Sequence, residues 1–244
     1  MCAPGIPMPP GQERRLFQPQ PRSVLISFSG LDGAGKSTQI EHLRAHLEAS
    51  GLATTLLAFW DDVVVGKRYR ESFVHAVYQS EVGVGTPGRP VNRRDKNVRH
   101  WYLSLARHGL YLLDALHLRH VVHRASANGP TVLIMDRFVY DELANLPLSN
   151  AFSRAYARFI AKVVAPQPDL AFVLDADPEA ARARKPEYPV EFMRECRQWY
   201  YRLADLLGGL TIVPPLPLAA VTARVVEQTE HILPVSSRCE LRST

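Results

Sequence analysis

Residues 24–37 read Val-Leu-Ile-Ser-Phe-Ser-Gly-Leu-Asp-Gly-Ala-Gly-Lys-Ser. The first five residues form a short apolar run that ends in glycine-rich sequence, and this pattern predicts a buried strand over residues 24–28. Apolar residues then recur on one face of residues 36–50, before Gly51, which predicts a helix. The loop between these two elements fits G-x-x-x-x-G-K-[S/T] at every position. The segment therefore has the order of a strand, a phosphate-binding loop and a helix.

The residue types of this loop suit a chain of phosphates for physical reasons. Glycine lets backbone N–H groups turn inward around phosphate oxygens, and the helix N-terminus adds a partial positive charge. We expect Lys36 to bridge the β- and γ-phosphates of a nucleotide, and the hydroxyl of Ser37 to coordinate Mg²⁺. The predicted nucleotide-binding residues are Gly30, Asp32, Gly33, Ala34, Gly35, Lys36, Ser37 and Thr38.

A phosphate-binding loop does not name a reaction, because switches, motors and kinases all use one. The chain lacks the guanine-reading N-K-x-D of small GTPases and a D-x-x-G after the second predicted strand. It has Asp136-Arg137 directly after a strand predicted over residues 131–135. A carboxylate in this place can hold Mg²⁺ or its water, and the adjacent guanidinium can bind a phosphate through two hydrogen bonds. Asp136 is therefore predicted as a metal ligand and Arg137 as a phosphate ligand, the alternative being a surface ion pair.

The composition is that of an ordinary globular protein, with 244 residues of which 46% are hydrophobic and 22% charged. Three cysteines without C-x-x-C spacing exclude a disulfide scaffold. There is no apolar run of about 20 residues and no apolar segment typical of a secretory signal, so we expect a cytoplasmic protein without a membrane partner. A net charge of +5 is mild, and no nucleic-acid partner is predicted from it.

Strand and helix patterns alternate along residues 22–234, which predicts a single α/β domain with a mainly parallel sheet and helices on both faces. Pro-rich residues 1–21 are expected to be a disordered tail, and residues 235–244 a second short tail. Further strands are predicted over residues 53–59, 170–174 and 210–213. Further helices are predicted over residues 72–80, 98–125, 149–165, 189–207 and 218–233, with a short helix whose cap is Asp177-Pro178.

Three segments are more specific than the loop pattern alone. They are Ser29–Gln39, Asp136-Arg137-Phe138-Val139, and Pro168-Asp169-Leu170 with Leu174-Asp175 and Asp177-Pro178. Together they resemble the thymidylate kinase family of nucleoside monophosphate kinases, and the likeness extends from about Val24 to Ile232. The resemblance implies a P-loop kinase fold with a parallel five-stranded sheet, ATP and Mg²⁺ as cofactors, and transfer of the γ-phosphoryl group to dTMP. It also places Asp32 close to the acceptor sugar and the metal.

The resemblance further implies a lid, where this chain has Arg182, Arg184 and Lys185. Gly33 stands where some members of the family have a basic residue, and members with a small residue there have compensating cations in the lid. Cations that arrive only on closure can stabilise the transferring phosphoryl group. The alternative is three solvated charges at a helix end. We predict that catalysis depends on four cations: Lys36, Arg137, Arg182 and Arg184.

The acceptor half departs from the family pattern. Phe59-Trp60-Asp61 replaces the family's Arg-Glu-Pro, and Tyr111–Ala115 matches its F-x-x-D-R without the arginine. After the Asp-Arg pair, Asp141 replaces a serine and Ala144-Asn145-Leu146 replaces Ala-Tyr-Gln. An unmatched buried polar group costs about 1–3 kcal/mol, so phosphoryl transfer from ATP is better supported than dTMP as the acceptor. The predicted acceptor-binding residues are Asp32, Tyr111, Arg137 and Asp141.

Two other functions stay open: a kinase for another small acceptor such as a nucleoside or a sugar, and a non-catalytic nucleotide-binding protein. Five cations in residues 89–99 are either phosphate ligands or a solvated loop. His117 and His120 share a helix face but have no third ligand at a suitable spacing, so a metal site is not predicted there. Tyr200 is expected in the core, with Trp199 and Leu203. A homodimer is left open as the assembly.

Overall fold

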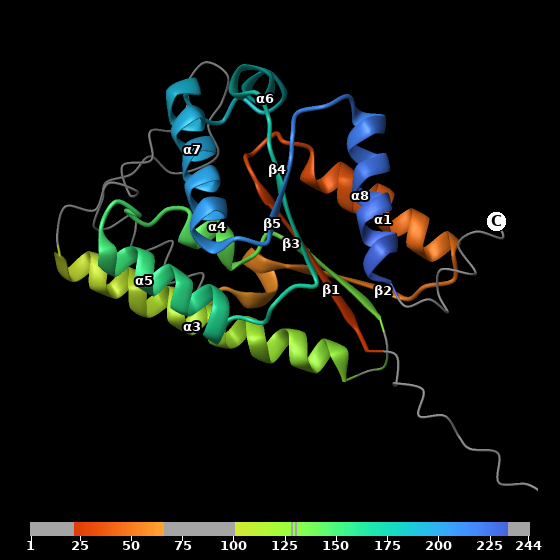
Figure 1. Ribbon diagram of the computed structural model, residues 1–244, viewed down its shortest axis with the longest axis horizontal. Helices are drawn as coiled ribbons and strands as arrows, with labels where there is room; N and C mark the ends of the chain where they lie inside the picture. Colours follow the sequence, from red (N-terminus) through yellow and green to blue (C-terminus); the bar gives the residue numbers. More distant parts are fainter. Residues whose placement is uncertain (1–21, 66–100, 128, 130, 234–244) are drawn as a thin grey trace, which may run out of the picture.

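A computed structural model of the chain describes residues 22–65, 101–127, 129 and 131–233. Five parallel strands form one sheet in the order β2-β3-β1-β4-β5 (Figure 1). The strands are β1 (Val24–Gly30), β2 (Thr54–Ala58), β3 (Val132–Asp136), β4 (Leu170–Leu174) and β5 (Leu210–Val213). The prediction of an α/β fold with a parallel five-stranded sheet is confirmed. Because β1 is the central strand, whatever follows it lies at the middle of the carboxyl edge of the sheet.

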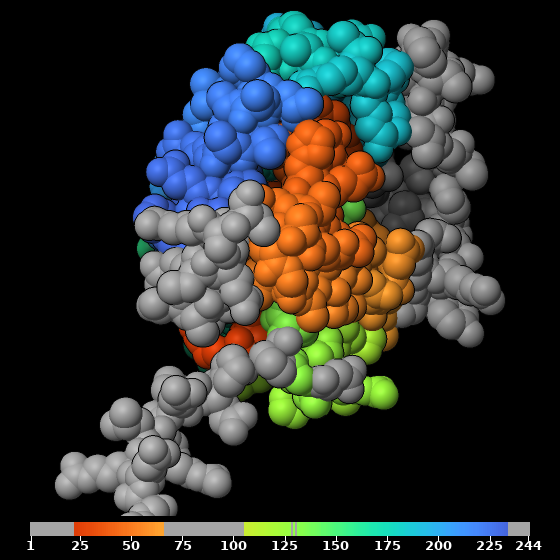
Figure 2. Space-filling model, turned by 90° about the vertical axis from the view of Figure 1, so that its right-hand side faces the viewer, coloured from red at the N-terminus to blue at the C-terminus, as the bar shows by residue number. Residues whose placement is uncertain are grey.

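The two faces of the sheet are covered by different helices. Side chains alternate along a strand, so Val24, Ile26 and Phe28 of β1 pack on one face while Leu25 packs on the other. Two helices cover the first face, α1 (Lys36–Ala49) and α8 (Leu218–Ile232), which lie side by side in Figure 2, α8 in blue and α1 in orange. The second face is covered by α3 (Trp101–Ser126), α5 (Ala151–Phe159) and α7 (Val190–Leu207).

The structure adds short helical segments that the sequence did not predict. A π-helical turn, η1 (Phe59–Val63), follows β2, and α4 (Val139–Leu143) follows β3. The helix predicted over residues 149–165 begins later, at α5, because Asn150 Oδ1 accepts a hydrogen bond of 2.6 Å from Ser153 N and caps the helix. Its last part is a second π-helical turn, η3 (Ile160–Val164).

The short helix α6 (Pro178–Arg184) begins as predicted. Asp177 Oδ1 accepts a hydrogen bond of 3.0 Å from Ala180 N, and Pro178 occupies the first helical position. The cap fixes the point at which α6 leaves the carboxyl edge of the sheet, beside β4.

Several predictions concern residues that the structure does not describe. They are the helix over residues 72–80, the basic residues Arg89, Arg93, Arg94, Lys96 and Arg99, and the tails 1–21 and 235–244. Among the helices that are described, none is long and apolar enough to span a bilayer.

Candidate active site

The loop after β1 is built on glycines that no other residue can replace without strain. Gly30, Gly33 and Gly35 have φ values of 131°, 79° and 85°. A Cβ at Gly30 would lie 2.3 Å from the carbonyl oxygen of Leu174 in the neighbouring strand β4. The loop therefore lies directly against β4, at the carboxyl edge of the sheet, because its glycines permit both the backbone conformation and the close approach.

The first turn of α1 is open to an anion. Gly35 is the N-cap in the left-handed conformation, no side chain caps the helix, and the first turn contains no acidic residue. The first N–H groups of a helix have no partner within the helix, and the N-cap Gly35 has no side chain to take their place. The positive end of the helix dipole therefore points to the loop, as a phosphate site requires.

Lys36 is folded back over the loop. Its Nζ donates hydrogen bonds to the carbonyl oxygens of Gly30, at 2.9 Å, and of Leu31, at 2.8 Å. Burial, together with the charge of Arg137, lowers the pKa of Lys36 to about 8. An ammonium group has three donors, so one remains when both carbonyls are bound. The bridging of phosphates by Lys36 stays a prediction.

Arg137 links the loop to the segment after β3. Its backbone N–H donates to Phe28 O at 2.9 Å, and its φ of 65° lies in the left-handed region that non-glycine residues rarely adopt. The guanidinium donates through Nη2 to Asp32 Oδ1 in the loop, and through Nη1 to Asp141 Oδ1 in α4 at 2.9 Å. The structure thus brings three predicted site residues into one ion-pair chain.

The opposite charges of Asp32, Arg137 and Asp141 stabilise one another's ionised forms. Burial acts to raise the pKa of Asp32, but the nearby charges of Arg137 and Lys36 outweigh it, and the pKa is lowered. Burial opposes the positive charge of Arg137, but Asp141 and Asp32 outweigh it, and the pKa of the guanidinium is raised. Both groups are therefore ionised, which is the state in which the guanidinium can also bind a phosphate.

Asp141 is buried, and its carboxylate is bound within the protein. Its Oδ2 accepts from Phe138 N at 3.1 Å. Its Oδ1 accepts from Arg137 and from the hydroxyl of Tyr200, the latter at 2.7 Å. The predicted contact of Asp141 with an acceptor stays a prediction, and the partners that the structure gives it are a cation, an amide and a phenol.

Tyr200 is a site residue that the sequence analysis missed. Its ring packs against the buried core that contains Leu203, which agrees with the expected core position. Its hydroxyl leaves the core and reaches Asp141 and, at 3.3 Å, the carbonyl oxygen of Gly30. A tyrosine among apolar residues of a helix gives no signal of such a contact, because the partners are 59 and 170 residues away along the chain.

The positions aligned with the family's acceptor contacts differ in their surroundings. Ala115 and Leu146 belong to the hydrophobic core and are 0% and 4% exposed. Asp114 is buried and accepts a hydrogen bond of 2.9 Å from Val65 N, so it holds the backbone just after η1. Trp60 in η1 is exposed, and Tyr111 on α3 is partly buried against the core.

The helix α6 lies against the loop through its backbone. A Cβ at Gly33 would lie 2.6 Å from the carbonyl oxygen of Ala181 in α6. Arg184 is exposed and donates from Nε to Ala180 O of its own helix, at 3.2 Å. Within the described part of the chain, no ion pair joins Arg182 or Arg184 to the loop. The lid interpretation of these two cations stays a prediction.

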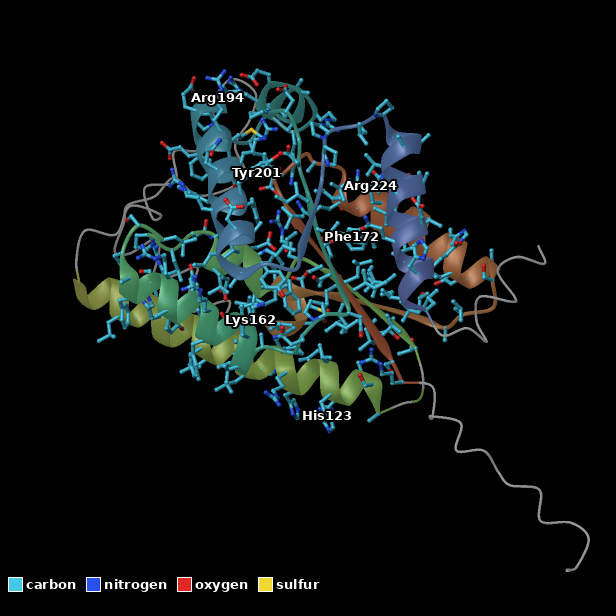
Figure 3. All side chains as sticks on the ribbon, in the orientation of Figure 1. His123, Lys162, Phe172, Arg194, Tyr201 and Arg224 are labelled. Atoms are coloured by element: carbon cyan, nitrogen blue, oxygen red, sulfur yellow. The ribbon has the colours of Figure 1, made fainter. Side chains whose placement is uncertain are left out.

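Polar contacts tie α7 to the sheet and to α6. Arg197 donates from Nε and Nη2 to the two carboxylate oxygens of Asp175, at 2.7 and 2.6 Å, and the hydroxyl of Tyr201 donates to Asp175 Oδ2 at 2.9 Å. Arg194 pairs with Glu179 of α6. Figure 3 labels Tyr201 between α7 and the sheet, and Arg194 at the end of α7 near α6. A cavity of about 570 Å³ lies between these helices, apart from the loop.

The histidine pair of α3 has an internal partner. Nδ1 of His117 donates to Val63 O at 2.6 Å, and its ring centroid lies 6.3 Å from that of His120. In residues 22–65, 101–127, 129 and 131–233, no group of three or more His, Cys, Asp and Glu residues could hold a metal ion. His117 thus helps to attach η1 to α3.

A phosphate-binding loop at the centre of a parallel sheet, with a lysine and an Asp-Arg pair beside it, defines the P-loop kinase class. A family model for thymidylate kinase matches residues 28–208, and the chain belongs to this family. It is 27% identical over 191 residues to the thymidylate kinase of Bifidobacterium longum subsp. infantis, with 74% of each chain covered. It is 27% identical over 198 residues to the probable thymidylate kinase of Methanosphaera stadtmanae, covering 80% of this chain and 90% of the relative.

A third relative, the thymidylate kinase of Chlorobium luteolum, is 30% identical over 164 residues, which is 66% of either chain. The predicted resemblance is confirmed, and the chain is an enzyme of the nucleotide kinase type.

Proposed function

We propose that the chain transfers the γ-phosphoryl group of ATP to a nucleoside monophosphate, and that dTMP is not its preferred acceptor. The observation behind the first half is the position of Arg137. Its guanidinium is held between Asp32 of the phosphate-binding loop and Asp141 of α4, so a phosphate-binding cation lies beside the loop. This is where the acceptor phosphate and the γ-phosphate have to meet.

The residues present fit a bound nucleotide triphosphate. The uncapped first turn of α1, the glycine conformations and Lys36 would hold its phosphates. Ser37 and Asp136 would hold Mg²⁺, since Ser37 is exposed in the first turn of α1 and Asp136 lies close enough to Lys36 for its charge to oppose, in part, the lowering of the Lys36 pKa by burial. When bound, Mg²⁺ supplies positive charge that neutralises the β- and γ-phosphates.

The protein's own contribution is positioning and charge, without a protein nucleophile. The bond between the γ-phosphorus and its bridging oxygen breaks, an acceptor phosphate oxygen forms the new bond, and the products are ADP and a nucleoside diphosphate. In this proposal Arg137 orients the acceptor or the γ-phosphate, and Arg182 and Arg184 approach when α6 closes.

The surroundings of four positions support an acceptor other than dTMP. Ala115 and Leu146 are core residues and offer no polar group to a base. Asp141 is bound to Arg137 and Tyr200. Trp60 belongs to Phe59-Trp60-Asp61, which replaces the family's Arg-Glu-Pro with its phosphate-binding arginine. A pocket that has lost its hydrogen-bonding groups for one base no longer favours that base over its competitors.

A rate comparison tests the proposal. The full chain is supplied with saturating ATP and Mg²⁺, and ADP formation is followed with dTMP, dUMP, dCMP, dAMP, dGMP, the ribonucleoside monophosphates and the parent nucleosides. We expect the highest kcat/KM with a monophosphate other than dTMP. If dTMP is fastest, the acceptor argument is wrong. A nucleoside as the best acceptor indicates a hydroxyl kinase, and no acceptor-dependent rate indicates a non-catalytic nucleotide-binding protein.

A further inference from the structure

The hydroxyl of Tyr200 lies where two hydrogen-bonded chains of the site meet. It donates to Asp141 Oδ1 at 2.7 Å, and Asp141 in turn binds the guanidinium of Arg137. It also lies 3.3 Å from the carbonyl oxygen of Gly30, which accepts a hydrogen bond from Lys36. A side chain of α7 therefore contacts both the carboxylate that binds Arg137 and the loop that follows β1.

The phenol acts as a donor. Burial, together with the negative charge of Asp141, raises the pKa of Tyr200 well above its usual value, so the hydroxyl keeps its proton at neutral pH. One proton serves two acceptors, and the shorter contact to a charged oxygen is the stronger of the two. The principal partner of Tyr200 is therefore the carboxylate of Asp141.

The contact to Tyr200 restricts the orientation of Asp141. The side chain of an aspartate rotates in a broad, roughly two-fold well, so a carboxylate needs several partners to stay in one plane. Phe138 N fixes Oδ2, at 3.1 Å, and Tyr200 fixes Oδ1. With both oxygens fixed, Asp141 presents one geometry to Nη1 of Arg137, at 2.9 Å.

We propose that Tyr200 is a positioning residue that holds Asp141, and through it Arg137, in the orientation that phosphoryl transfer requires. The part of this proposal that concerns phosphoryl transfer rests on the proposed function. Tyr200 acts from α7, which follows α6 directly along the chain, so the orientation of Arg137 depends on the packing of the helix that borders the lid segment.

The neighbouring residue provides a matched control. Tyr201 lies on the same helix and also donates its hydroxyl to a buried carboxylate, that of Asp175, at 2.9 Å. Asp175 is bound by Arg197 and not by Arg137. Tyr200→Phe and Tyr201→Phe therefore remove the same atom and the same kind of hydrogen bond. Only Tyr200→Phe removes a hydrogen bond to the carboxylate that binds Arg137.

The experiment compares the two variants with the unchanged chain in steady-state kinetics. Because a hydrogen bond to a charged group contributes about a tenfold factor, we expect Tyr200→Phe to lower kcat/KM for the acceptor about tenfold. We expect the KM of Tyr200→Phe for ATP to stay within about twofold of the value for the unchanged chain. For Tyr201→Phe, both kcat/KM for the acceptor and KM for ATP should stay within about twofold. Equal losses in the two variants would overturn the proposal, because a purely structural role affects both alike.

A second measurement does not depend on turnover. The guanidinium signal of Arg137 in ¹⁵N NMR, assigned by its loss in Arg137→Lys, reports the surroundings of this side chain. We expect it to shift in Tyr200→Phe and to stay in place in Tyr201→Phe. If the unchanged chain has no activity with any acceptor, the proposed function fails while this spectrum still decides the positioning role. An unshifted signal in Tyr200→Phe rejects that role.

Discussion

The phosphate-binding loop and the positions aligned with the family's acceptor contacts are built in different ways. The loop is one contiguous segment, residues 30–37, whose shape follows from a strand, three glycines with positive φ and a helix start. The residues aligned with the family's acceptor contacts come from three separate elements, η1, α3 and α4, and the turn after α4. A local motif keeps its geometry as a unit, whereas positions spread over distant segments can change one residue at a time.

The two regions also differ in how their charged groups are bound. Lys36 donates to neutral carbonyl oxygens of the loop, which phosphate oxygens can replace as stronger acceptors. Arg137 and Asp141 are bound to each other and to further charged or phenolic groups. The donor side is therefore ready for exchange with a ligand, while the polar groups at the start of α4 largely bind one another. Four experiments with variants, in order of decreasing expected effect, test this contrast alongside the acceptor panel.

The largest effect is expected for Lys36→Ala. Removal of an ammonium group that meets the β- and γ-phosphates should lower kcat/KM by about 10²- to 10³-fold. The measurement is ADP formation with the best acceptor of the panel. Lys162→Ala removes an exposed lysine of η3 and should retain full activity. Near-normal turnover of Lys36→Ala would disprove the role of the loop, provided that circular dichroism shows an unchanged fold.

Arg184→Ala should mainly lower kcat, by about tenfold, with a smaller change in the KM for ATP. The reason is that Arg184 binds its own helix in this structure, and the lid interpretation predicts that it meets the phosphates only on closure. Arg224→Ala, on the exposed side of α8 (Figure 3), is the control and should be unaffected. If Arg182→Ala and Arg184→Ala both keep full kcat, these cations are merely solvated.

Gly33→Ala should lower kcat about fivefold, because a small displacement of catalytic groups already costs rate. Its Cβ would meet the carbonyl oxygen of Ala181 at 2.6 Å and move α6 away from the loop. Gly51→Ala is the matched control, with a φ of 74° and open space around the added Cβ. Both variants lose about 1–2 kcal/mol of stability from the left-handed backbone. Equal kcat values in the two variants would show that the contact of α6 with the loop has no role in catalysis.

The smallest effect concerns stability and pH. Burial lowers the pKa of Lys36 to about 8, while an unfolded lysine titrates near 10.5. Between these values the unfolded chain binds more protons, so this residue makes folding more favourable as the pH rises from 8 to 9.5, by about 1–2 kcal/mol. Urea unfolding at several pH values should show that gain in the unchanged chain and not in Lys36→Met. Parallel pH profiles would mean that Lys36 is solvated.

Much of the fold could be predicted from the sequence. The apolar run at residues 24–28, the glycines of the loop and the Asp177-Pro178 cap act through local backbone preferences, and each element lies where the sequence placed it. The errors lie where local signals are weak. The turns η1 and α4 are short, and the start of α5 depends on the Asn150 side chain.

The candidate site, too, has a part that the sequence predicts and a part that it does not. The sequence alone determined the phosphate-binding loop and the Asp-Arg pair after β3, because contiguous residues fix their own backbone geometry and their chemistry follows from residue type. Only the tertiary structure decided that Arg137 lies between Asp32 and Asp141, and that Tyr200 of α7 completes this chain. The physical reason is that a side-chain hydrogen bond requires two groups within about 3 Å in one orientation. Residues far apart in sequence meet that condition only once the sheet and its helices are packed.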